Sequence, residues 1–323
     1  DQSISTLNVN GDDIKISMHL AEALALNGQY QEAQKELSRA ISLDSNKGYE
    51  NDLKKTQVQL IKLELQDGIE EKRISLEDMS QKATQLLQLD PKDEYAKEVL
   101  VYIASEHYNN KDYTKAEAAL QRISNAGELS PDARLLMMNV LVKQDYLTDE
   151  VLNLFQKTKK DIQEGKLSLS TTGAEAENLD QRLRKNYELA EISKYLKDRY
   201  KKQEYSVSEK QFYENIGDIL VVKSKLPNEK LKEDPIELKK ESIYYYGLAG
   251  KNAKVMEQSS QVGDLVSQKF KDLDEKIASE TNLDKKIELE SEATKLKKEA
   301  FNYYFTAQRW DEVEESLKQA AKS

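Results

Sequence analysis

The 323-residue sequence contains no cysteine, only 2 histidines, and few residues that break helices, with 4 prolines and 11 glycines. Without cysteine the chain can form neither disulfides nor thiolate-based metal or nucleophilic sites. Two histidines are too few for a histidine-rich catalytic metal centre. The scarcity of glycine and proline disfavours a β-sandwich or barrel, in which turns recur every ~8–12 residues. With many strong helix formers present, the predicted fold class is all-α.

The charge balance and the lack of long apolar runs exclude two kinds of partner. Acidic residues number 59 against 49 basic ones, which gives a net charge of −10. Sequence-independent binding of nucleic acid depends on neutralising phosphates, so no nucleic-acid partner is predicted. The sequence has no apolar run of about 18 residues, so no membrane-spanning helix is predicted either.

The chain begins with Asp1 rather than with methionine. Such a start fits a mature N-terminus left after removal of a signal peptide, and it also fits a trimmed chain. The favoured interpretation is a periplasmic, exported protein, while a cytoplasmic location stays open.

Apolar and small residues recur at helical spacing in two successive segments between residues 20 and 46. Asn27-Gly28 separates the segments and can supply the left-handed residue that ends a helix. The pattern predicts a helical hairpin whose small residues let two helices approach closely. The second helix would pack through an aromatic residue and a series of small or apolar ones, namely Tyr30, Ala33, Leu37 and Ala40.

This spacing of aromatic and alanine positions resembles the tetratricopeptide repeat (TPR) family, whose members stack helical hairpins. The proline that usually follows the second helix is present as Pro91 in one unit and replaced by Ser45 in another. The resemblance implies a stack of degenerate TPR-like hairpins and specifies no partner. Further segments with related offsets are residues 79–91, 103–123, 135–152 and 300–320.

A polar, glycine-containing stretch at residues 161–179 is predicted to be a linker or loop between two helical arms. Residues 14–160 would form a TPR-like arm, preceded by a flexible segment at residues 1–13. Residues 180–323 would form an arm of long helices that ends in a TPR-like hairpin. Two such arms predict an elongated or bent molecule.

Within the second arm, residues 262–278 carry apolar side chains at alternating four- and three-residue steps. That spacing is typical of a coiled-coil seam. Residues 283–304 read as one long helix with Thr281 or Asn282 as its cap. The two helices are expected to pack antiparallel.

No constellation in the sequence predicts catalysis. Acid pairs such as Glu314-Glu315 are expected by chance among 59 carboxylates and read as solvated helix faces. His19 and His107 fall on separate helices without further ligand residues, so each reads as a packed or surface side chain. No P-loop, nucleophile elbow, zinc-protease or dinucleotide-binding motif occurs. We therefore expect no enzymatic activity, no metal and no cofactor.

Tyrosine is unusually frequent, at 17 residues against 5 phenylalanines and 1 tryptophan. Consecutive helical side chains point about 100° apart, so Tyr244, Tyr245 and Tyr246 cannot all be buried on one face. Tyrosine is enriched at protein interfaces because its rigid apolar ring ends in a hydroxyl. Packing between helices is the other role open to these residues. The predicted partner-binding residues are Tyr187, Tyr195, Tyr200, Tyr205, Tyr213, Tyr244, Tyr245, Tyr246, Tyr303, Tyr304 and Trp310.

Two functions stay open, and the first is a non-catalytic scaffold. Stacked helical hairpins form extended surfaces for other proteins. The size, helical pattern and Lys/Glu/Ser/Tyr-rich composition resemble the flagellar coiling proteins of spirochaete periplasmic flagella. That resemblance implies a component of the filament sheath that helps impose filament curvature and supports motility. Its partners would be other flagellar sheath proteins and flagellins.

The alternative is a TPR adaptor or envelope-assembly protein that binds a client peptide in a concave groove. A TPR clamp for acidic peptide tails needs lysine, arginine and asparagine on its inner helices. The predicted first helices offer only Lys15, Asn27, His107 and Asn110. Co-purification with a filament would favour the scaffold, and capture of a client peptide would favour the adaptor.

Overall fold

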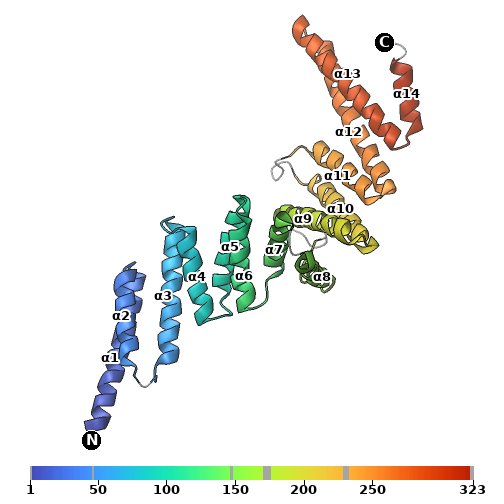
Figure 1. Ribbon diagram of the computed structural model, residues 1–323. Coiled ribbons are helices and arrows are strands. Elements are labelled where there is room, and N and C mark those ends of the chain that lie inside the picture. Colours follow the sequence, from blue (N-terminus) through green and yellow to red (C-terminus); the bar gives the residue numbers. More distant parts are fainter. Residues whose placement is uncertain (1, 46, 146–147, 170–175, 228–232, 321–323) are drawn as a thin grey trace. The chain divides into compact units, whose positions relative to one another are not determined.

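The computed structural model describes residues 2–320 except residues 46, 146–147, 170–175 and 228–232 (Figure 1). Every regular element among these residues is an α-helix, and no strand occurs in the described ranges, which confirms the predicted all-α class. Consecutive helices pack against one another as hairpins. The helices are α1 (Gln2–Leu26), α2 (Tyr30–Leu43), α3 (Glu50–Glu70), α4 (Leu76–Leu89), α5 (Glu94–Asn109), α6 (Tyr113–Ala126), α7 (Pro131–Gln144), α8 (Thr148–Gln163), α9 (Ala176–Tyr200), α10 (Gln203–Lys223), α11 (Pro235–Ala249), α12 (Asn252–Ser279), α13 (Leu283–Thr306) and α14 (Trp310–Ala320).

The helices form two compact units, Asp1–Tyr146 with α1–α7 and Leu147–Ser323 with α8–α14. The sequence had suggested a boundary at residues 161–179 instead. Within that stretch Leu167 and Leu169 are buried, so its described part packs into the second unit. The remainder either falls on residues 170–175, outside the described residues, or begins α9.

The predicted first hairpin is present as α1 and α2. Gly28 ends α1 with a left-handed φ of 74°, which glycine adopts without steric cost. Residues 2–13, predicted as a flexible segment, lie in α1. The two helices meet through one buried cluster of small and apolar residues that includes Ala21, Ala25, Ala33, Leu37 and Ala40.

Side-chain caps fix where several helices begin. Ser75, Asp93 and Ser130 accept hydrogen bonds from backbone N–H groups in the first turns of α4, α5 and α7. Such caps pair donors that a helix start would leave unsatisfied. Asn282 caps α13 in the same way, with 3.1 Å between its Oδ1 and the backbone nitrogen of Lys285. This cap, which the sequence had left open between two residues, lets α13 fold back along α12 as predicted.

In the second unit, a tyrosine ring packs against a helical glycine where α10 meets α11. A Cβ atom added at Gly217 would lie only 2.6 Å from Cε1 of Tyr246. The Tyr246 hydroxyl donates to Oδ1 of Asp218 at 2.7 Å. Lys254 of α12 lies 2.7 Å from the same oxygen and 5.1 Å from the centre of the ring. The glycine and these three side chains therefore connect three successive helices.

The same tyrosine–glycine contact recurs where α12 meets α13. A Cβ atom at Gly263 would lie 2.7 Å from Cε1 of Tyr304. The Tyr304 hydroxyl lies 3.2 Å from Oδ1 of Asp264, and Arg309 binds that oxygen at 2.5 Å. The guanidinium group of Arg309 lies 4.8 Å from the centre of the Tyr304 ring, within the range of a cation–π interaction. This second contact connects α12, α13 and the turn before α14.

Replacing Gly217 by alanine should therefore destabilise the second unit. A methyl group would force the Tyr246 ring out of place, and overpacking of this kind costs about 1–3 kcal/mol. The gain in helix propensity offsets about 1 kcal/mol, so we expect a net loss of about 1 kcal/mol in the free energy of unfolding. Urea denaturation of the variant and of the wild type measures this change in the free energy of unfolding.

Gly247 provides the matched control, because it lies in α11 and nothing lies within 4 Å of a Cβ added there. Gly247→Ala should leave stability unchanged or raise it by up to about 1 kcal/mol. Equal effects of the two substitutions would contradict the packing assigned to Gly217.

Candidate partner-binding surface

The predicted partner-binding aromatic residues differ in their exposure to solvent. Tyr244 and Trp310 are exposed, with 61% and 55% of their surface accessible. The side chains of Tyr205, Tyr246 and Tyr304 are buried. The remaining residues are half-buried, namely Tyr187, Tyr195, Tyr200, Tyr213, Tyr245 and Tyr303.

Several half-buried tyrosines pack against one another between α9, α10 and α11. The ring centres of Tyr187 and Tyr245 are 5.2 Å apart in an edge-to-face arrangement, and those of Tyr213 and Tyr245 are 5.9 Å apart. The Tyr187 hydroxyl donates to Glu241 at 2.7 Å. Their rings also contact the buried side chains of Ile216 and Leu220. These tyrosines hold helices together, which is the second role that the sequence had left open.

A further group joins α8, α9 and α10. The ring of Tyr205 lies 6.2 Å from Phe155 and 6.1 Å from Tyr200, measured between centres. The Tyr200 hydroxyl donates to Asp149 at the start of α8. The ring of Tyr195 lies 5.3 Å from the guanidinium group of Arg199. This group, too, is engaged within the second unit.

The three consecutive tyrosines of α11 point in different directions, as predicted. Tyr246 is buried against Gly217, Tyr245 is half-buried among the other tyrosines, and Tyr244 faces outward. Leu248 lies one turn beyond Tyr244 and is 39% exposed. Of the three, Tyr244 is the one whose side chain is mainly exposed to solvent.

A group of exposed apolar side chains lies at the hairpin of α13 and α14. Phe305 and Leu317 are 55% and 56% exposed, like the neighbouring Trp310. The ring of Phe305 lies 5.4 Å from Trp310, edge to face, and 6.4 Å from Phe301, stacked. We call these four residues the aromatic edge. Phe305 was not among the predicted partner-binding residues, although its position four residues after Phe301 indicates a shared helix face.

The turn between α13 and α14 positions the aromatic edge. Gln308 adopts a left-handed φ of 58° and reverses the chain. Arg309 then binds Asp264 of α12 and Glu312 of α14, which fixes the start of α14. Val313 is buried, whereas Trp310, at the first position of α14, is 55% exposed and lies edge to face against Phe305.

Acidic side chains accompany the aromatic edge on α14, together with the exposed Lys318, whose Nζ lies 2.5 Å from Oε1 of Glu314. Asp311, Glu314 and Glu315 are exposed on this helix. A hydrogen bond from Arg309 lowers the pKa of the Glu312 carboxyl, and the ion pair offsets the charge of that carboxylate. Tryptophan and phenylalanine in an exposed cluster are typical of protein-binding sites, where a few aromatic anchors supply most of the affinity. The aromatic edge therefore combines exposed apolar rings with neighbouring charged side chains of both signs.

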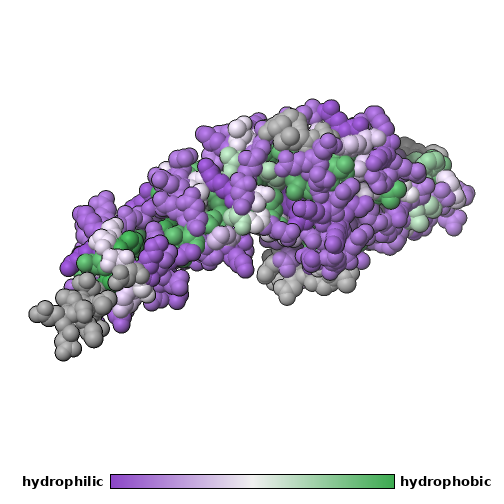
Figure 2. Space-filling view, turned by 60° about the horizontal axis from the view of Figure 1, so that its bottom comes forward, coloured by the Kyte–Doolittle hydropathy of each residue, from purple (hydrophilic) through white to green (hydrophobic). Residues whose placement is uncertain are grey.

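Most of the visible surface is hydrophilic, with isolated hydrophobic areas (Figure 2). Within the described ranges, no group of three or more acidic or histidine side chains is arranged to hold a metal ion. None of the helices described is both long and apolar enough to cross a membrane.

Buried tyrosine hydroxyls should make the second unit sensitive to alkaline pH. Burial, followed by the hydrogen bond to Asp218, raises the pKa of Tyr246 far above its ordinary value of 10.0, and burial raises the pKa of Tyr213 to about 12. Because the unfolded chain releases these protons first, stability is fully present below pH 10 and is lost as pH rises toward the folded-state values. The free energy of unfolding, measured in urea between pH 9 and 12, should fall.

Tyr246→Phe separates this effect from the loss of lysine charges in the same pH range. The variant should be less stable than the wild type at pH 9 by about 1 kcal/mol, because it lacks one hydrogen bond. That difference should shrink as pH rises to 12. A constant difference across the range would show that Tyr246 does not titrate on unfolding.

No protein-family model matches the chain, and no curated protein matches it with significant similarity. The molecule is thus defined by its architecture, an all-helical chain of consecutive hairpins. Its function is inferred from the side chains that this architecture exposes.

Proposed function

We propose that this protein is a non-catalytic scaffold that assembles with other proteins through the aromatic edge. The observation that carries the proposal is the exposure of Phe305, Trp310 and Leu317 on one hairpin. Fully burying an exposed large apolar side chain stabilises a complex by about 1.5–3 kcal/mol. Covering these three side chains would therefore contribute substantially to the free energy of binding. Tyr244 and Leu248 on α11 form a second, smaller outward-facing pair.

The internal use of the other aromatic residues supports this assignment. Tyr246 and Tyr304 are buried against glycines, and Tyr187 and Tyr245 pack against each other. Against that background, an exposed tryptophan beside an exposed phenylalanine serves no evident packing purpose within its own unit. A surface that binds a partner accounts for it.

The consecutive hairpins are TPR-like in this proposal, and the chain serves in a larger assembly. Repeated helical hairpins present extended surfaces along which other proteins can bind. Following the resemblance described above, we assign the chain to the sheath of a periplasmic flagellar filament, where it would contact sheath proteins and flagellins. Binding along one side of a filament would help impose its curvature and so support motility.

Trp310→Ala should weaken assembly without weakening the fold. Loss of an aromatic anchor costs an interface about 2 kcal/mol or more, which is roughly a 30-fold loss of affinity. The tagged variant is returned to its source cell, and the fraction that sediments with the filament is compared with that of the wild type. Thermal unfolding of the purified variant should shift little, because Trp310 is already 55% exposed.

Tyr102→Ala is the matched control, since Tyr102 is a 49% exposed aromatic residue on α5 of the first unit. It should sediment like the wild type. If Trp310→Ala sediments as fully as Tyr102→Ala, the aromatic edge is not the assembly surface. If the wild-type protein does not sediment with filaments at all, the sheath assignment fails.

A further inference from the structure

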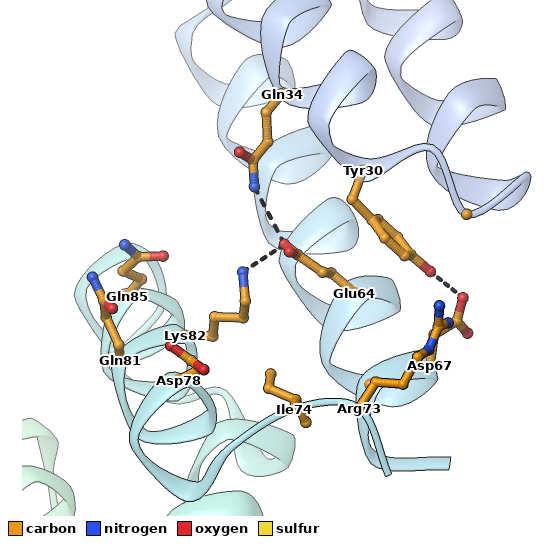
Figure 3. A pocket seen from close by; sticks show the side chains of 12 residues that line it. Tyr30, Gln34, Glu64, Asp67, Arg73, Ile74, Asp78, Gln81, Lys82 and Gln85 are labelled. Carbon is orange, nitrogen blue, oxygen red and sulfur yellow. Dashed lines mark hydrogen bonds and ion pairs between the residues drawn. The ribbon is translucent and has the colours of Figure 1, made fainter. Parts of the chain in front are cut away.

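A continuous groove runs along α3 between α2 and α4 in the first unit. It consists of two adjoining cavities with volumes of about 560 and 480 Å³. Gln34 of α2 and Gln85 of α4 line both cavities, so the two are parts of one groove. Figure 3 shows the first cavity, with Tyr30 and Gln34 on one side, Gln81, Lys82 and Gln85 on the other, and Glu64 of α3 between them.

The helices give the groove a direction. The first cavity is lined by the earlier parts of α2 and α4 and by the later part of α3. The second cavity is lined by later residues of α2 and α4 and by earlier residues of α3. The two walls therefore run the same way, and α3 forms the floor in the opposite direction. We call the first cavity the polar end and the second the apolar end.

Uncharged side chains follow both walls at helical spacing, beside the charged Asp78 and Lys82 at the polar end of the α4 wall. Four- and three-residue steps place side chains on one face of a helix, so each series forms one wall. Glutamine amides both donate and accept hydrogen bonds. The wall residues are Gln34, Ser38 and Ile41 on α2 and Gln81, Gln85 and Gln88 on α4.

The apolar end offers a place for an apolar side chain. Its floor includes the buried residues Leu60 and Ile61, and Leu37 lies beside them. Ile41 borders this end and is 48% exposed. Among the residues that the structure describes, those lining this end are all uncharged. A ligand side chain placed here would cover Ile41 and meet no charge.

At the polar end, charged side chains are paired with neighbours. Oε2 of Glu64 lies 2.7 Å from Nζ of Lys82 and accepts a hydrogen bond from Gln34 at 3.2 Å. Asp67 accepts a hydrogen bond from Tyr30 (Figure 3). An ionic ligand would have to compete with these contacts, whereas an uncharged ligand would leave them intact.

We infer that this groove binds an extended, uncharged segment of polypeptide, with an apolar side chain at the Ile41 end. An extended chain exposes its N–H and C=O groups, which the glutamine amides of both walls can pair. A helical ligand satisfies its own backbone and would not need those amides. From Gln57 to Gly68, α3 is about 16 Å long at a rise of about 1.5 Å per residue. An extended segment of about five residues spans that length.

This inference is independent of the proposed scaffold function. The aromatic edge lies on α13 and α14, while the groove lies in the other unit. The groove also differs from a concave surface of first helices, because its walls are α2 and α4, the second helices of two successive hairpins. Its ligand chemistry is uncharged, unlike that of a clamp for acidic peptide tails.

Two blocked pentapeptides of opposite order test the inference, acetyl-Leu-Ser-Ser-Ser-Ser-amide and acetyl-Ser-Ser-Ser-Ser-Leu-amide. The side-chain amide signals of Gln34 and Gln85 are followed in nitrogen–proton correlation spectra of the intact labelled protein. One of the two peptides should shift these signals saturably below about 5 mM. The same peptide with N-methylated backbone amides should bind at least about tenfold more weakly, because its donors are removed.

Variants of the protein provide the second arm of the test. The double variant Gln34→Ala, Gln85→Ala should reduce affinity at least about tenfold, followed through the signals of Gln81 and Gln88. Gln59→Ala is the matched control, since Gln59 is exposed on α3 and outside the groove lining, and should bind like the wild type. If the double variant unfolds, the single variant Gln85→Ala replaces it, and it too should bind the peptide more weakly than the wild type.

Three results would overturn the inference. The first is that neither peptide shifts the glutamine signals at about 5 mM. The second is that the N-methylated peptide binds as well as its parent, and the third is that the bound peptide is helical. Stronger binding of a lysine- or glutamate-substituted peptide would overturn the uncharged character of the ligand.

Discussion

The packing of a tyrosine ring against a helical glycine is the interaction on which the second unit depends most. Glycine lets the ring approach the backbone, the following aspartate binds the hydroxyl, and a basic side chain covers the ring. The arrangement occurs at Gly217 with Tyr246 and again at Gly263 with Tyr304. Because Arg309 belongs to the second contact, the same interaction also sets the turn that places Trp310.

This constraint explains why the exposed aromatic residues are informative. Most tyrosines of the second unit join helices, and their hydroxyls pair with carboxylates such as Glu241 and Asp218. The few exposed aromatic rings therefore differ from the others, because they do not take part in this packing between helices. Phe305 and Trp310 touch each other yet remain more than half exposed, which is the property expected of an interface that a partner completes.

Local patterns predicted much of the fold but little of the surface. The turn at Gly28, the cap at Asn282 and the long pair α12 and α13 follow from spacing and capping rules that act within a few residues. Which of the three consecutive tyrosines turns inward depends on a glycine of another helix, which periodicity cannot reveal. The groove likewise joins Gln34 and Gln85 from separate hairpins. The division into units follows Tyr146, whereas the polar composition of residues 161–179 had suggested a linker there, and that composition does not reveal that Leu167 and Leu169 are buried.

Hydroxyl-radical footprinting of the free protein and of the protein in its native assembly tests the central claim most directly, because it reports the exposure of each aromatic ring in one experiment. In the free protein, Trp310, Phe305 and Tyr244 should be labelled strongly, and Tyr246 and Tyr304 should be protected. In the assembly, the account predicts that Trp310 and Phe305 become protected while Tyr102 stays labelled. Equal labelling of Trp310 in both states, or strong labelling of Tyr246 in the free protein, would contradict it.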